Sequence, residues 1–173
     1  MDLYFSPLAC SMATRIALYE AGADARFLQV DGKAKRVADG TDFWSVNPLG
    51  LVPTLRTNSG EVLTENAAIL QYVAERFPDA KLIPSAGLER ARVQQWICFI
   101  GTELHKALFI PLLDPKAPQA AKDYALAKGR SRLDYLNSHL ADRDTLAERF
   151  SVADVYLYVV LNWTMATPPV NLA

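Results

Sequence analysis

Hydrophobic and polar positions change their period twice within the first thirty residues. Residues 2–5 form a short apolar run that a Ser-Pro pair ends, which predicts a strand. From Ser11 to about Gly22, apolar residues recur every three or four positions, which predicts a helix. Residues 27–30 predict a second strand. This order favours two parallel strands joined by a right-handed crossover.

The next fifty residues add a polar segment, a hairpin and a helix. Residues 32–40 are polar and basic, which predicts a loop or a weak helix. Residues 52–55 and 61–63 flank a Gly-containing turn, which predicts an antiparallel hairpin. A helix is expected from residues 64–66 to Phe77, where Pro78 ends it. The first eighty residues therefore run βαβ and then ββα.

Beyond a predicted linker at residues 78–87, every pattern is helical. We expect two domains, residues 1–80 and an all-helical 86–173. The first long helix shows two apolar stripes, one through Trp96 and Leu104 and a second that joins Cys98, Thr102, His105 and Phe109. Further helices are expected at about 119–140 and from Ser151, where Ser-x-x-Asp resembles a capping box.

Composition excludes several classes of protein. Apolar residues make up 51% of the 173, and 18 basic residues face 19 acidic ones, so disorder and nucleic-acid binding are not expected. The N-terminus lacks the pattern of a signal peptide, and no run of eighteen apolar residues occurs, so no membrane span is expected. Two cysteines fit a reducing, cytoplasmic compartment.

Cys10 lies between the first strand and the first helix. Free amides and the dipole at a helix N-terminus favour a thiolate, and thioredoxin-like folds present a reactive sulfur at this place. Position 13 is Ala13, so the partner of a CxxC pair is missing. The alternative is that Cys10 is a small buried apolar residue.

Cys98 and His105 fall within the long helix. Cys98 lies among large apolar residues, so packing is its default interpretation. A single helical histidine is more often structural, but His105 would be able to donate to a sulfur if its stripe faced the first domain. The two histidines are far apart in sequence, so no metal site is expected.

Three segments of the first domain suit a small acidic thiol peptide. Glu65 and Asn66 are capping residues, but at a helix start they also suit the ammonium and carboxylate of an amino acid. The basic run around Lys35 is either a solvated surface or a carboxylate site. Val52-Pro53 is interpreted as an exposed strand edge whose backbone pairs with a peptide. Glutathione is the obvious ligand of this kind.

On these residues the whole chain resembles the bacterial cytosolic glutathione S-transferases, specifically the beta class. The shared segments are residues 3–11, 47–53, 63–65, Thr-Glu-Leu-His-Lys at 102–106, and residues 150–157. The resemblance implies a thioredoxin-like N-terminal domain, an all-helical C-terminal domain, a homodimer, and glutathione as cosubstrate for a hydrophobic electrophile. No metal is implied.

The resemblance also implies roles for individual residues. Cys10 would face the glutathione sulfur and form a mixed disulfide with it, with His105 near that sulfur. Pro53 would be cis. The remaining contacts to glutathione would come from Lys35, Val52, Glu65, Asn66, Thr102 and Glu103.

The chain departs from the family pattern at four places. The class usually has Ser at position 66 and Tyr at position 5, where this chain has Asn66 and Phe5. Cys98 stands where relatives often place Asn, and a second redox-active thiol is one interpretation. The chain stops before the last helix of the family, so the apolar helix from Val155 is expected to expose a large patch.

These departures leave alternatives open. The first is a transferase that conjugates glutathione to electrophiles, or reduces disulfides or peroxides through Cys10. The second is a non-catalytic binding or scaffold protein of the same fold. A thiol-dependent isomerase or a reductive dehalogenase is a third, because a fold does not fix a function.

Overall fold

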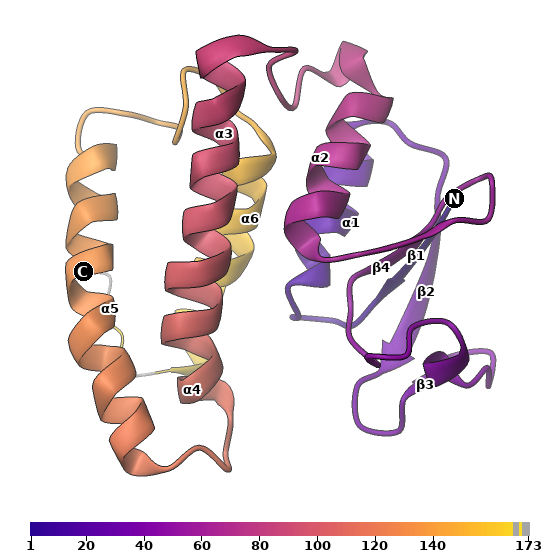
Figure 1. Cartoon of the computed structure of the whole chain (residues 1–173), viewed down its shortest axis with the longest axis horizontal. Helices are drawn as coiled ribbons and strands as arrows, with labels where there is room; N and C mark the ends of the chain where they lie inside the picture. Colours follow the sequence, from indigo (N-terminus) through magenta and orange to yellow (C-terminus); the bar gives the residue numbers. More distant parts are fainter. Residues whose placement is uncertain (168–169, 171–173) are drawn as a thin grey trace. The chain divides into compact units, whose positions relative to one another are not determined.

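Strand β1, Asp2–Phe5, lies at the centre of a five-stranded sheet in the computed structural model, which describes residues 1–167 and 170. On one side β2, Arg26–Asp31, runs parallel to β1, with Leu3 opposite Phe27. On the other side β4, Thr54–Arg56, runs antiparallel. Helix α1, Ser11–Glu20, connects β1 to β2, so the predicted pair of parallel strands joined by a helix is confirmed (Figure 1).

The sheet has the order β3-β2-β1-β4-β5. The predicted hairpin is confirmed, because β5, Val62–Thr64, pairs antiparallel with β4, and α2, Asn66–Arg76, follows it. Residues 32–40 form the expected loop except at two positions. There, β3, Arg36–Val37, pairs with the end of β2. Two residues are too few for the period-2 pattern by which strands are recognised.

The N-terminal unit has an apolar layer on each face of the sheet. Helices α1 and α2 lie side by side against one face (Figure 1). The other face is covered by a short 3₁₀ turn, Phe43–Ser45, and the segment after it. Tyr4 belongs to the cluster on that second face, while Phe5 contacts Phe27 beside α1. Neighbouring residues of β1 thus supply opposite layers, as strand geometry requires.

The second unit, Ala86–Ala173, is helical throughout its regular structure, while Met1–Ser85 forms the first unit. Helix α3, Gly87–Phe99, continues through a π-helix, Ile100–Phe109, into α4, Ile110–Leu113. It packs against α5, Gln119–Leu140, and α6, Val152–Leu161. The βαβ-ββα unit and the helical unit confirm the predicted fold class.

The helix that spans residues 87–113 is also long and apolar enough to cross a membrane, judged by length and composition alone. Core helices of folded domains pass the same test. This helix contributes the buried side chains of Val93, Ile97, Ile100 and Leu104 to the interior of the helical unit. Its packing is that of a core helix.

The predicted second stripe of this helix is wrong. His105 and Phe109 are buried, whereas Cys98 and Thr102 are exposed. A stripe drawn at 100° per residue assumes α-helical geometry throughout. The π-helix hydrogen-bonds from i to i+5 and so has more residues per turn, which rotates the residues after Ile100 out of that phase.

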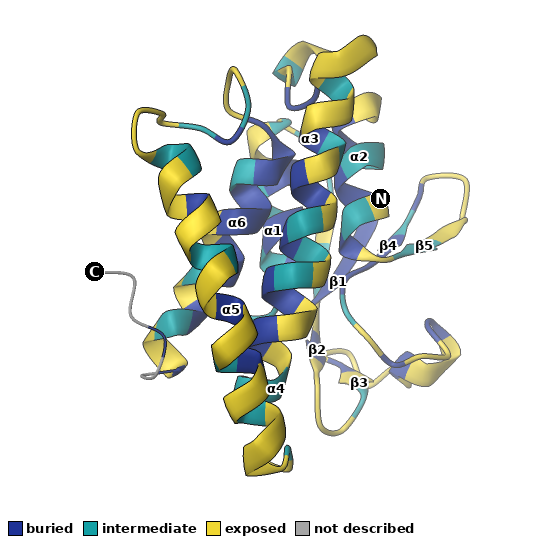
Figure 2. Ribbon diagram, turned by 60° about the vertical axis from the view of Figure 1, so that its left-hand side comes forward, coloured by how far each residue is buried: buried dark blue, intermediate teal, exposed yellow. Residues whose placement is uncertain are grey.

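Helix α6 begins with the predicted capping box. The Ser151 hydroxyl accepts from the Ala153 amide at 3.3 Å, and Asp154 Oδ2 accepts from the Ser151 amide at 2.9 Å. The expectation of a large exposed apolar patch is wrong, because Tyr158 is the only exposed residue between Val155 and Val160. Figure 2 shows α6 largely buried. The expectation for the chain end, residues 168–173, lies outside the described residues except for Val170.

Candidate functional site

Cys10 is placed by the turn that leads from β1 into α1. It is the N-cap residue of α1 with helical backbone angles, φ −56° and ψ −23°. Its half-buried side chain contacts the segment before β4, and the Cys10 thiol donates to the Val52 carbonyl oxygen at 3.4 Å. Because a thiolate cannot donate, this hydrogen bond belongs to the protonated sulfur. The Cys10 sulfur therefore lies where it was predicted, between β1 and α1, and it is hydrogen-bonded to a backbone carbonyl group.

Buried polar groups fix the segment that carries Val52. Asn47 donates to the Leu51 carbonyl at 2.8 Å and to Thr54 Oγ1 at 3.0 Å. The Thr54 hydroxyl donates to the same Leu51 carbonyl at 3.0 Å. Both side chains are buried, so the chain just before Val52 has one defined path. The spacing of seven residues between Asn47 and Thr54 carries no recognisable signal in the sequence.

The Val52–Pro53 peptide bond is cis, as the resemblance implies. The interpretation of this pair as an exposed strand edge is wrong. Strand β4 is an interior strand, paired with β1 and β5. Val52 instead lies just before the ladder and is half-buried, which leaves its backbone beside Cys10 rather than on the rim of the sheet.

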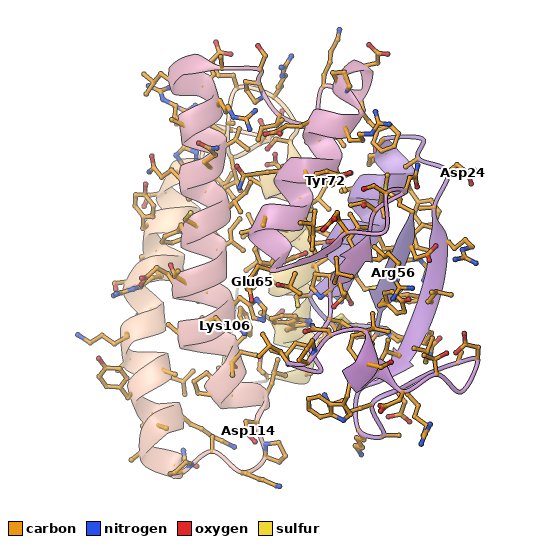
Figure 3. All side chains as sticks on the ribbon, turned by 45° about the vertical axis from the view of Figure 1, so that its right-hand side comes forward. Asp24, Arg56, Glu65, Tyr72, Lys106 and Asp114 are labelled. Carbon is orange, nitrogen blue, oxygen red and sulfur yellow. The ribbon has the colours of Figure 1, made fainter. Side chains whose placement is uncertain are left out.

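Glu65 and Asn66 lie at the start of α2, but neither side chain caps that helix. Glu65 is exposed and has a positive φ of 65°, and Figure 3 shows it where the chain turns into α2. Asn66 is buried. Its side chain accepts from Thr14 Oγ1 at 2.8 Å and donates to the Cys10 carbonyl at 3.2 Å. The predicted capping role is wrong, because the side-chain amide of Asn66 is hydrogen-bonded to residues Cys10 and Thr14 at the start of α1.

Lys35 reaches back to the loop before Val52. Its ammonium donates to the Gly50 carbonyl at 2.9 Å, and Nζ lies 5.9 Å from the centre of the Trp44 ring. This cation is therefore held near the same segment of the N-terminal unit as Cys10 and Val52. A carboxylate placed there would meet a positive charge that is already oriented.

The candidates of the helical unit have partners of their own. The Thr102 hydroxyl donates to the Cys98 carbonyl at 3.0 Å, which is a bond to the preceding turn of its helix. Glu103 Oε2 accepts from Arg132 Nε of α5 at 2.8 Å. Glu103 thus joins two helices through an ion pair, a role that its sequence position did not indicate.

His105 is buried within the helical unit, with only 5% of its surface exposed. Its Nδ1 lies 2.7 Å from the Tyr156 hydroxyl of α6, and its ring packs edge-on against Trp163. Burial, with a smaller contribution from the charge of Lys106, lowers the pKa of His105 to about 4. The imidazole is therefore neutral at pH 7 and offers hydrogen bonds rather than a positive charge.

The thiol of Cys98 lies on the exposed side of α3, and neither Cys98 nor Cys10 forms a disulfide. Packing, the default interpretation of Cys98, is therefore not its role. Within residues 1–167 and 170, no three His, Cys, Asp or Glu side chains are grouped so that they could hold a metal ion.

The N-terminal unit thus brings the starts of α1 and α2 together with the Val52–Pro53 turn. A thiol, a backbone amide segment, an exposed carboxylate and an oriented ammonium surround this place. These groups define a thioredoxin-like domain that can bind a peptide thiol beside a protein sulfur.

Comparison with known proteins agrees with this class. Residues 2–75 match the family described as Glutathione S-transferase, N-terminal domain, and residues 99–172 match Glutathione S-transferase, C-terminal domain. Glutathione S-transferase GstA of Escherichia coli O157:H7 is 40% identical over 168 residues, which cover 96% of this chain and 83% of the relative. The chain belongs to the glutathione S-transferase family.

Solved structures of bacterial relatives are also similar. The beta class enzyme of Sphingomonas chungbukensis is 44% identical, with a TM-score of 0.89 over 98% of this chain and 88% of that one. A sphingomonad glutathione S-transferase in complex with glutathione is 43% identical, with the same TM-score and the same coverage. The predicted resemblance to the bacterial beta class is confirmed.

Proposed function

We propose that the protein is a glutathione transferase that joins the glutathione sulfur to small hydrophobic electrophiles and exchanges disulfides through Cys10. Family membership and relatives that are named glutathione S-transferases support transferase activity with glutathione as cosubstrate. One observation carries the involvement of Cys10. Its sulfur lies 3.4 Å from the Val52 carbonyl, at the backbone segment proposed to bind the cosubstrate.

In this proposal each part of glutathione meets a different segment of the N-terminal unit. The γ-glutamyl end lies at the start of α2, with its ammonium near the exposed Glu65 carboxylate and its carboxylate near the backbone amide of Asn66. The cysteinyl backbone pairs with Val52, beside cis Pro53, and Lys35 meets the far carboxylate. For Thr102, Glu103 and His105, the proposed contact with glutathione rests on the resemblance alone.

Two reactions follow from a thiol peptide held beside Cys10. In conjugation, the glutathione thiolate attacks an electrophilic carbon and a leaving group departs with the electron pair. In thiol transfer, the Cys10 thiolate attacks the glutathione sulfur of a mixed disulfide and releases the other thiol. A second glutathione thiolate then attacks the Cys10–glutathione disulfide, which gives oxidised glutathione and restores Cys10.

The substitution Cys10→Ala separates these reactions. We expect the rate of thiol transfer, measured with a glutathione mixed disulfide, to fall at least about 100-fold, because no protein sulfur remains to carry the intermediate. Conjugation of an aryl halide should fall far less. The matched control is Cys98→Ser, which removes the exposed thiol of α3 and should change neither rate. Equal rates of thiol transfer in Cys10→Ala and the parent protein would refute the role of Cys10.

The second candidate is a non-catalytic glutathione-binding protein. The departures of Phe5, Asn66 and Cys98 from the class pattern favour it. Retention on immobilised glutathione without turnover of an aryl halide or a mixed disulfide would support this candidate. Turnover in either assay would exclude it.

We also propose a cytoplasmic homodimer. Cys10 and Cys98 form no disulfide, which suits a reducing compartment, and dimerisation follows the family resemblance. Sedimentation equilibrium at micromolar concentration should give a mass near twice the 19.1 kDa of one chain. A mass of one chain at all concentrations would contradict the dimer.

A further inference from the structure

The Asn66 side chain links the starts of two helices. Asn66 is the first residue of α2, and only 5% of its surface is exposed. Its Oδ1 accepts from the hydroxyl of Thr14, which is fully buried in α1, at 2.8 Å. Its Nδ2 donates to the backbone carbonyl of Cys10 at 3.2 Å. Both hydrogen bonds join α2 to the start of α1, and neither of them is made to a group of α2 itself.

The Cys10 carbonyl, which accepts a hydrogen bond from the Asn66 side chain, lies at the start of α1. It belongs to the N-cap residue of α1 and also receives the Ala13 amide at 3.0 Å. Its position therefore sets the direction of the peptide group between the reactive residue and the first turn of the helix. That turn supplies the amide groups which stabilise negative charge on a sulfur at a helix N-terminus.

A primary amide suits this place because it carries a donor and an acceptor on one planar group. Thr14 fixes the acceptor, which leaves the donor directed at Cys10. A hydroxyl group at position 66 would also offer a donor and acceptors, but on a single oxygen atom, whereas the amide places its acceptor and its donor on two separate atoms. Asn66 and Thr14 thus form a pair in which one orients the other.

We propose that Asn66, oriented by Thr14, is a positioning residue for Cys10. It keeps the Cys10 backbone, and with it the sulfur beside Val52, in the geometry that permits nucleophilic attack. The inference rests on the proposed function of Cys10 in thiol transfer. It assigns the Asn66 side chain to the protein's own sulfur and leaves the backbone amide of Asn66 for the cosubstrate.

The test measures the reactivity of Cys10 without glutathione. All variants carry Cys98→Ser, so Cys10 is the single thiol, and its alkylation by iodoacetamide at pH 7 is followed by intact mass. We expect Asn66→Ala and Thr14→Val to slow alkylation by about fivefold, because the helix N-terminus no longer holds the sulfur in place. Thr14→Ser keeps the hydroxyl and should restore the rate to within about twofold.

A matched control separates positioning from general loosening of the fold. Thr57 is buried in the same unit, and its hydroxyl accepts from the Glu61 amide at 3.1 Å. It follows β4 on the side where Arg56 pairs with Asp2, opposite the end that carries Val52. Thr57→Val should therefore lower thermal stability as Thr14→Val does, without slowing alkylation.

Two results would overturn the inference. One is alkylation of both Asn66→Ala and Thr14→Val within about twofold of the parent rate. The other is a slowdown that Thr57→Val shares or that Thr14→Ser does not relieve. If Asn66→Ala fails to fold, the three threonine variants decide the question. Because glutathione is absent, a failed proposal for glutathione binding would leave these rates unaffected.

Discussion

Both the backbone angle at position 50 and the neighbouring Trp44 ring favour glycine there. The φ of Gly50 is +59°, a region that favours glycine, and a β-carbon there would lie 2.7 Å from the Trp44 ring. Its carbonyl accepts the Lys35 ammonium, and Leu51 and Val52 follow it directly. A change at Gly50 therefore acts on the backbone segment proposed to bind glutathione.

We expect Gly50→Ala to weaken glutathione binding at least about fivefold and to lower the free energy of unfolding by about 2–4 kcal/mol, because strain and a steric clash add. Gly22→Ala is the matched control. Gly22 has nearly the same φ, +60°, but no atom within 4 Å of the added carbon, so only backbone strain remains. Calorimetric titration and urea unfolding measure both quantities. Equal losses in the two variants would contradict the role of the Trp44 contact.

The sequence was sufficient to locate Cys10, because a cysteine before a helix has a recognisable context. It was not sufficient to assign Asn66. A residue at the start of a helix predicts a cap, whereas its bonds to Thr14 and Cys10 depend on how α1 and α2 pack. The same limit applied to Asn47, whose partner Thr54 is identified only once the loop has closed.

Among the elements, the longer helices and strands were predictable, whereas the two-residue β3 and the π-helix were not. Helix α5 occupies residues 119–140 as expected, since its period is uniform. Local spacing also identified the capping box of α6, because all its atoms belong to residues 151–154. Residues Ile100–Phe109 form a π-helix with more residues per turn than an α-helix, and a pattern read at 100° per residue cannot reveal this.

Packing of the π-helix against α5 depends on a glycine. A β-carbon at Gly129 would lie 2.5 Å from Cδ1 of Leu108, which is almost fully buried. In an exposed helix, Gly→Ala stabilises by about 1 kcal/mol, because the backbone loses less entropy on folding. Here the clash with Leu108 opposes that gain.

We therefore expect Gly129→Ala to lower the free energy of unfolding by about 1–3 kcal/mol. In a Leu108→Ala background, the same substitution should be neutral or stabilising, because the added methyl group enters the space that the leucine left. Urea unfolding of the four proteins measures this coupling. If Gly129→Ala had the same effect in both backgrounds, the proposed contact would not be the cause.

At the scale of the whole molecule, the two units respond to acid over different pH ranges. In the N-terminal unit, the hydrogen bond from Arg26 lowers the pKa of Asp2 below its ordinary value of 3.8. Stability from this pair is present above that value and is lost as the pH falls further. In the helical unit, burial lowers the pKa of His105 from 6.5 to about 4. As the pH falls, the helical unit therefore begins to lose stability at a higher pH than the N-terminal unit does.

The direction for His105 follows from proton binding. Between pH 6.5 and 4 the unfolded chain binds a proton at His105 that the folded chain does not, so stability falls as the pH decreases. From pH 7 to pH 5 the helical unit should lose about 2 kcal/mol. Urea unfolding of Trp44→Phe, followed by tryptophan fluorescence, reports this unit, since the remaining Trp96 and Trp163 both belong to it.

His105→Gln should remove this early loss, because glutamine can still bond to Tyr156 but does not titrate. His139→Gln is the matched control, since it removes the other histidine of the chain and leaves His105 in place. Acid unfolding should therefore begin in the helical unit, well above the pH at which the Asp2–Arg26 pair is lost. A loss between pH 7 and pH 5 that persisted in His105→Gln would show that another group of the helical unit takes up the proton.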